Sequence, residues 1–93
     1  SLFYYPVMKI LELTDVSRKD TLIYYRREFM ANAVIEVLSK SRTIPVEFIL
    51  EQSPLGKIDT KVNIKQDLDF PVLPLISKLK HYIRDMDERG VLP

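Results

Sequence analysis

Few side chains in this sequence are spaced as a catalytic or metal-binding site would need. His81 is the only histidine, and Asp85 lies one helical turn further along, so the two could ligate a metal from one helix face. Two ligands at this spacing are common by chance, and a surface position is the ordinary interpretation of a lone histidine. The chain has no cysteine, and Gly56-Lys57 is not followed by the helix that a phosphate-binding loop requires. We therefore predict a non-enzymatic domain with no cofactor and no metal.

Cations beside aromatic rings indicate a different chemistry, the binding of a nucleic acid. Residues 18–42 hold six cations and three carboxylates, and a Tyr-Tyr pair directly precedes an Arg-Arg pair. Guanidinium groups bind phosphates and aromatic rings stack on bases. The candidate contacts are Arg18, Lys19, Arg26 and Arg27. Because the chain carries a net charge of only +1, a solvated surface is the more ordinary interpretation, and nucleic-acid binding is our second hypothesis.

Apolar and aromatic residues in the same segment favour protein binding as the first hypothesis. Aromatic residues and arginines are enriched at protein interfaces, and this short chain has five Tyr and four Phe. If the segment is helical, its apolar face is wider than one small sheet can cover. We therefore predict an interaction or assembly domain that forms a homo-oligomer, or binds a partner protein, through Leu22, Tyr25, Phe29 and Met30.

Length and composition are those of one small globular domain. The chain has 93 residues, of which 46% are hydrophobic and 29% charged, which suffices for a single core. The absence of cysteine excludes disulfides and favours a cytoplasmic protein. No apolar run approaches the roughly 18 residues of a membrane-spanning helix, so we predict no membrane partner. The first residue is Ser1 and not Met, which is compatible with a domain of a longer protein.

A long helix over Ser17–Ser41 is the element that would position most of these residues. The segment contains neither Pro nor Gly, and its apolar residues recur at intervals of three, four and seven. Ser17 followed by Asp20 resembles a capping box, and cations at Lys40 and Arg42 suit a helix C-terminus. The spacing therefore predicts one amphipathic helix.

The segment before it, Phe3–Thr14, has two interpretations. As a strand its alternation is imperfect, because Lys9 would share a face with Val7 and Leu11. As a helix it would start well at Pro6 but would be only about eight residues long. We favour the strand.

Alternating residues between 44 and 65 predict an antiparallel hairpin. Two runs alternate with mostly polar neighbours: Ile44, Val46, Phe48 and Leu50, then Ile58, Thr60, Val62 and Ile64. Between the runs, Pro54 suits the second position of a type I turn and Gly56 the left-handed bulge position. This turn pairs Glu51 with Asp59, and a slip of two residues would relieve their repulsion. We favour the register that the turn specifies.

A second helix is predicted from Pro71 or Pro74, with Pro74 favoured as the first helical position. Its apolar stripe consists of Ile76, Leu79, Ile83 and Met86. Gly90 is the expected C-terminal cap, and Asp85 can pair with Arg89.

The predicted architecture is a single α+β domain covering residues 1–93, with two layers. Its order is β-α-β-β-α, and both helices pack on one face of a small antiparallel sheet. If Phe3–Thr14 is helical, the order α-α-β-β-α resembles a winged helix, which is the second possibility. A winged helix needs a break within Ser17–Ser41, and the sequence offers no glycine there.

Overall fold

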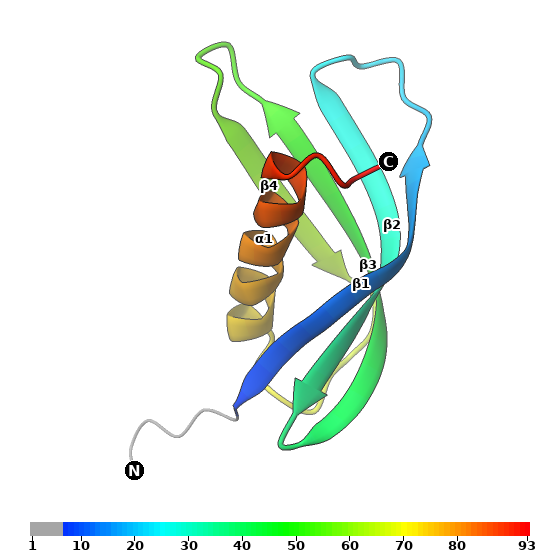
Figure 1. Ribbon diagram of the computed structural model, residues 1–93, viewed down its shortest axis with the longest axis vertical. Helices are drawn as coiled ribbons and strands as arrows, with labels where there is room; N and C mark the ends of the chain where they lie inside the picture. Colours follow the sequence, from blue (N-terminus) through cyan, green and yellow to red (C-terminus); the bar gives the residue numbers. More distant parts are fainter. Residues whose placement is uncertain (1–6) are drawn as a thin grey trace.

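The computed structural model describes residues 7–93 as a four-stranded antiparallel sheet with one helix packed on one face (Figure 1). Each strand pairs with the next in sequence, so the sheet order is β1-β2-β3-β4. The elements are β1 (Met8–Lys19), β2 (Arg26–Val37), β3 (Lys40–Gln52), β4 (Ile58–Ile64) and α1 (Val72–Glu88). The two-layer α+β class was predicted, but the order is β-β-β-β-α.

The long helix predicted over Ser17–Ser41 is wrong, and with it the orders β-α-β-β-α and α-α-β-β-α. That segment contains the end of β1, a loop, all of β2 and the start of β3. Along β2, burial alternates strictly from Phe29 to Val37, with odd positions buried and even positions more exposed. A period of two is the signature of a strand with one covered face.

A two-residue turn at Leu38 and Ser39 joins β2 to β3. Both residues have positive φ angles, 52° and 65°, and Val37 pairs with Lys40 across the turn. Positive φ at both central positions is the geometry of a type I′ hairpin turn, which matches the twist of the flanking strands. Asn and Gly usually occupy these positions, so Leu-Ser gave no turn signal in the sequence.

The strand interpretation of the N-terminal segment is confirmed from Met8 to Thr14, whereas Phe3–Pro6 lie outside the described residues. The imperfect alternation has a structural cause. One extra residue in β1 shifts the pairing with β2 at Leu11, and a second shift lies between Thr14 and Ser17. These irregularities restore the inward face, which carries Met8, Ile10, Leu13 and Val16.

The hairpin of β3 and β4 is confirmed in the predicted register. Glu51 pairs with Asp59, the Ser53 amide donates to the Lys57 carbonyl at 2.8 Å, and the Gly56 amide donates to the Ser53 carbonyl at 2.9 Å. Gly56 has a φ of 85°, which is the left-handed conformation expected at the bulge position. The turn chemistry therefore outweighs the repulsion between the two carboxylates.

Helix α1 begins at Val72, two residues before the predicted start at Pro74. Pro74 still lies in the first turn, where its missing N–H removes no intrahelical hydrogen bond. At the other end the predicted stop is confirmed: Gly90 has a φ of 69°, and the Val91 amide donates to the Met86 carbonyl at 3.1 Å. This is the Schellman arrangement. No helix within residues 7–93 combines the length and apolar character needed to cross a bilayer.

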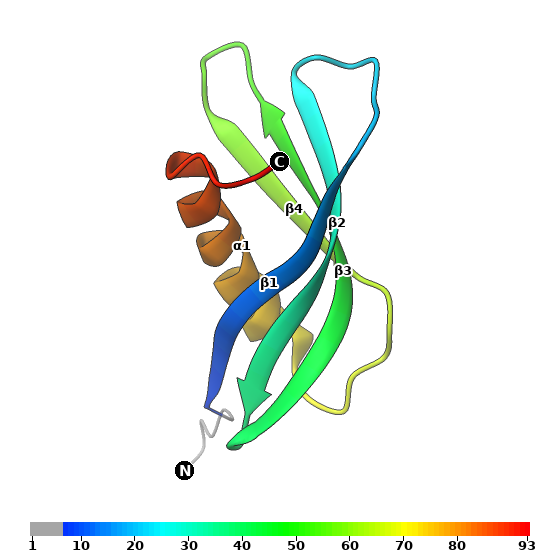
Figure 2. The same cartoon turned by 45° about the vertical axis from the view of Figure 1, so that its right-hand side comes forward.

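The core lies between α1 and the face of the sheet that the helix covers (Figure 2). Helix α1 contributes Leu75, Leu79 and Ile83. From the sheet, Phe29 of β2 stacks on Phe48 of β3 with ring centroids 4.8 Å apart. At the margin of the core, Arg27 of β2 binds Asp87 with both guanidinium Nη atoms, at 2.7 and 3.1 Å, and so ties the last turn of α1 to the sheet.

Candidate functional site

The end of the sheet at which loop 20–25 and turn 53–57 lie together carries the most exposed apolar side chains of the described chain (Figure 1). We call this surface the loop end. Leu22, Tyr24 and Leu55 are each at least 88% exposed. The two loops are linked, because the Gln52 amide donates to the Tyr25 carbonyl at 2.9 Å. The loop end is therefore one apolar surface built from two connections of the sheet.

A hollow of about 710 Å³ lies within the loop end. The rings of Tyr24 and Tyr25 meet edge to face with centroids 5.8 Å apart. The lining residues are Tyr24, Tyr25, Glu51, Gln52, Ser53, Pro54 and Asp59. Tyrosine rings beside a proline can hold an apolar side chain, and the hydroxyl and carboxylate groups can take hydrogen bonds at its rim.

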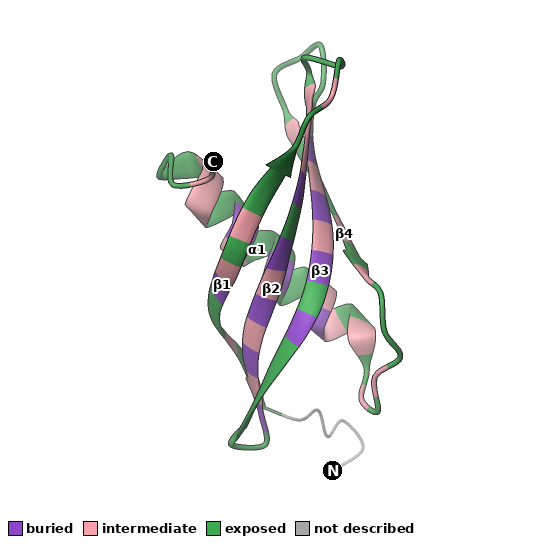
Figure 3. Ribbon diagram, turned by 90° about the vertical axis from the view of Figure 1, so that its right-hand side faces the viewer, coloured by how far each residue is buried: buried purple, intermediate pink, exposed green. Residues whose placement is uncertain are grey.

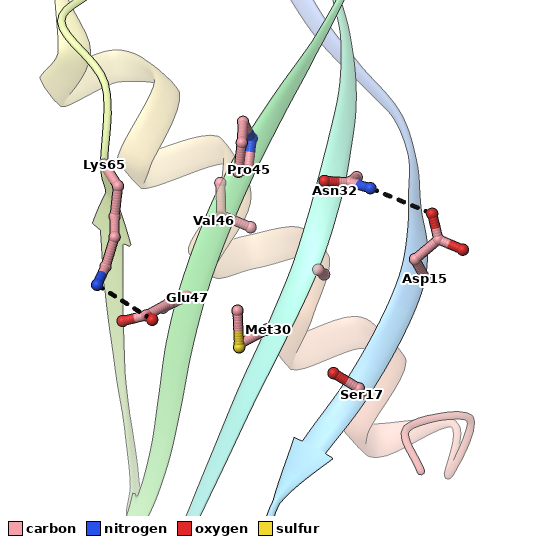
Figure 4. Close-up of a pocket in the computed structure, with 9 residues that line it drawn as sticks. Asp15, Ser17, Met30, Asn32, Pro45, Val46, Glu47 and Lys65 are labelled. Carbon is pink, nitrogen blue, oxygen red and sulfur yellow. Dashed lines mark hydrogen bonds and ion pairs between the residues drawn. The ribbon is translucent and has the colours of Figure 1, made fainter.

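The sheet face away from α1 is the second candidate surface (Figure 3). Met30 is 47% exposed there, beside a hollow of about 250 Å³ that Glu47 and Lys65 also line (Figure 4). Glu47 accepts hydrogen bonds from Lys19 and Lys65, each with an N–O distance of 3.2 Å. The charges of this face thus neutralise one another across the strands.

These two ammonium groups, Lys65 first and Lys19 second, hold the pKa of Glu47 below its ordinary value of 4.5. A carboxyl whose pKa is lower in the folded than in the unfolded state stabilises the fold above the unfolded pKa. That contribution is lost as the pH falls through the folded pKa. The stability difference between the wild type and Glu47→Gln should therefore be full at neutral pH and vanish in acid.

Urea unfolding at several pH values from neutral to about pH 3 measures this difference. Glu12→Gln is the matched control, since Glu12 is exposed and forms no ion pair within residues 7–93. A difference between the wild type and Glu47→Gln that stays constant over this range would contradict the prediction.

The structure does not bring the four predicted interface residues together. Leu22 and Tyr25 lie at the loop end, and Met30 lies on the open face of the sheet. Phe29 is completely buried on the opposite side of β2, because neighbouring residues in a strand point to opposite faces. Of the predicted set, only Leu22 and Tyr25 share a surface.

The four predicted nucleic-acid contacts are also divided between the faces. Lys19 binds Glu47 and Arg27 binds Asp87, so both already have carboxylate partners. Arg18 is exposed near the end of β1, and Arg26 has a buried Nε without a hydrogen-bond partner among the described residues. Nucleic-acid binding stays a prediction, and two of its four cations would first have to leave their partners.

Comparison with known proteins gives one match, to a family model that covers residues 5–88 and hence most of the chain. The chain belongs to the BB_0187 family. No curated protein and no solved structure matches it. The description of the BB_0187 family names no activity, ligand or partner, so a functional proposal has to rest on the geometry of the domain.

Sequence reasoning missed two residues of the loop end in this BB_0187 family domain, Tyr24 and Leu55. Their signal was present, since Leu55 is a large apolar residue at a turn position and the Tyr24 ring precedes a strand rather than filling a core position. No group of three or more His, Asp or Glu side chains within residues 7–93 could hold a metal ion.

Proposed function

We propose that this domain is a non-enzymatic protein-interaction module that self-associates through the loop end. The observation that carries the proposal is the near-complete exposure of Leu22, Tyr24 and Leu55 on two adjacent loops. Large apolar side chains gathered at one exposed place are typical of an interaction site. Burying each one removes apolar surface from water and favours association.

The loop end has the shape that association between identical copies requires. In a two-fold contact the same surface faces itself, so it must contain both projections and a hollow. Leu22 and Leu55 project, and the hollow between Tyr25 and Pro54 lies beside them. Two copies meeting end to end can each place a leucine against the other's tyrosines.

The two edges of the sheet disfavour the other common route, pairing between strands of different copies. The irregularities near Leu11 and Asp15 interrupt the ladder of β1, and Asp15 has a φ of 52°. Along β4 and its flanks, Lys57, Lys61 and Lys65 are exposed. Bulges and edge lysines are common features of strands that resist edge-to-edge pairing.

Sedimentation equilibrium over a range of concentrations tests the proposal. We expect a reversible dimer for the wild type and a dissociation constant raised about tenfold or more in the double variant Leu22→Ser, Tyr24→Ser, because one buried leucine contributes about 1.5–3 kcal/mol. Leu73→Ser is the matched control, since Leu73 is equally apolar and 80% exposed but lies on α1. A wild type that stays monomeric at about 1 mM, or an equal effect of Leu73→Ser, would overturn the proposal.

A further inference from the structure

A small groove between α1 and β4, separate from the loop end, gathers several hydrogen-bond donors. On α1, Ser77, Lys80, His81 and Arg84 recur at intervals of three, one and three, so they share one side of the helix beside the buried stripe. Opposite them lie Ile58, Asp59 and Thr60 of β4. The groove has a volume of about 210 Å³, which is the scale of one small charged group with its immediate substituent.

The charge in this groove is positive and not neutralised. Within residues 7–93 neither Lys80 nor Arg84 forms an ion pair, in contrast to Arg27, Arg42 and Arg89. Asp59 contributes to the lining, but it pairs with Glu51 and alternates with the inward-facing Thr60, so its side chain belongs to the opposite face of the sheet.

Thr60 provides a second and independent indication. It is only 5% exposed, and its hydroxyl has no hydrogen-bond partner among the described residues. A buried hydroxyl without a partner is unfavourable, and such groups in a folded protein call for an explanation. Because Thr60 lines the groove, a ligand with acceptor oxygens can supply the partner after a rotation about its χ1 bond.

We propose that this groove binds the phosphoryl group of a small phosphate monoester. The phosphoryl group offers three acceptor oxygens and about two negative charges. The groove offers the planar fork of Arg84, the ammonium of Lys80, the imidazole of His81 and the hydroxyls of Ser77 and Thr60. These donors outnumber what a single carboxylate can accept in a compact arrangement, which favours the phosphoryl group.

The surroundings favour a small ligand over an extended polyanion. Directly after Arg84 the helix becomes acidic, with Asp85, Asp87 and Glu88 in its last turn. A nucleic-acid backbone crossing the groove along the helix would meet these carboxylates and be repelled. A single terminal phosphoryl group ends before it reaches them.

Titration of the ¹⁵N-labelled protein, followed by amide chemical shifts at constant ionic strength, tests the proposal. The probes are inorganic phosphate, glycerol 3-phosphate as the monoester, and a short single-stranded oligonucleotide as the diester. We expect saturable shifts confined to residues 58–60 and 77–84 for the first two probes, and no saturable shifts there for the oligonucleotide. Absence of saturation with phosphate and glycerol 3-phosphate, or tighter binding of the oligonucleotide at these residues, would overturn the proposal.

Variants separate a built site from general attraction to positive charge. Arg84→Gln should weaken binding of glycerol 3-phosphate about tenfold, because it removes charge-assisted hydrogen bonds. Thr60→Val keeps the shape of the side chain and should weaken binding about threefold while leaving the fold intact. Lys78→Gln is the matched control, since it removes the same charge from an exposed position of α1 outside the groove and should leave binding unchanged. An effect of Lys78→Gln equal to that of Arg84→Gln would contradict the assignment.

Discussion

Phe29→Ala is expected to lower the free energy of unfolding by about 3–5 kcal/mol. Phe29 is completely buried, and its ring stacks on Phe48 at the centre of the sheet face that α1 covers. Truncation to alanine removes the apolar surface of the ring and leaves a cavity that the surrounding strands cannot fill. A domain of this size has a total stability of about 5–15 kcal/mol, so the change is a large fraction of the whole.

Met30→Ala is the matched control for Phe29→Ala. Met30 is the next residue along β2 and is 47% exposed on the other face, so its truncation should cost less than about 1 kcal/mol. Urea denaturation followed by circular dichroism gives both values. If Phe29→Ala does not fold, Phe29→Leu provides a measurable loss of about 1 kcal/mol. Equal losses at positions 29 and 30 would contradict the alternation of β2.

Leu79→Ala is expected to cost about 2–5 kcal/mol, the second largest effect among our predictions. Leu79 is completely buried in the middle of α1, and Leu75 and Ile83 lie one turn before and after it. Most of the stability of a helix in a protein comes from packing of its apolar face, so this truncation should weaken attachment of the whole helix to the sheet.

Leu73→Ala on the same helix is the control for Leu79→Ala. Leu73 is 80% exposed, so the same chemical change should cost less than about 0.5 kcal/mol. Hydrogen exchange of the α1 amides adds a local measurement, since Leu79→Ala should speed exchange along the helix more than in β2 and β3. Identical protection of α1 in the two variants would contradict this account of how the helix is held.

The error over residues 17–41 has a physical origin in β2. Its inward positions include Ala31 and Ala33, which are good helix formers, and its outward positions include the apolar Met30 and Val34. Together these residues fill intervals of three and four as well as intervals of two. Apolar residues on both faces therefore mimic an amphipathic helix, and only the strict burial of the odd positions distinguishes the strand.

The hairpin of β3 and β4 and the end of α1 were predictable because local chemistry determines them. Gly56 and Gly90 both adopt positive φ, and each lies where a turn or a helix stop requires that conformation. The turn at Leu38 and Ser39 uses the same backbone geometry without glycine. Since the pairing of β2 with β3 depends on that turn, the sequence offered no local evidence for the two strands to be neighbours.

The candidate sites were only partly predictable, since each depends on which loops or elements the fold brings together. Leu22 and Tyr25 were named from their residue types alone, but Leu55 joins them only because turn 53–57 lies beside loop 20–25. In the α1–β4 groove, Thr60 and Arg84 are far apart in sequence and meet through the packing of the helix on the sheet.

The position of α1 after all four strands has a consequence for synthesis of the protein. Consecutive pairing lets the sheet form from its turns while the chain emerges from the ribosome, since each strand needs only its predecessor. The face bearing Phe29, Ile35 and Phe48 is therefore complete before the residues that cover it have been translated. During this interval the nascent domain presents its most hydrophobic surface to other proteins, and a chaperone or rapid translation of the last segment would protect it.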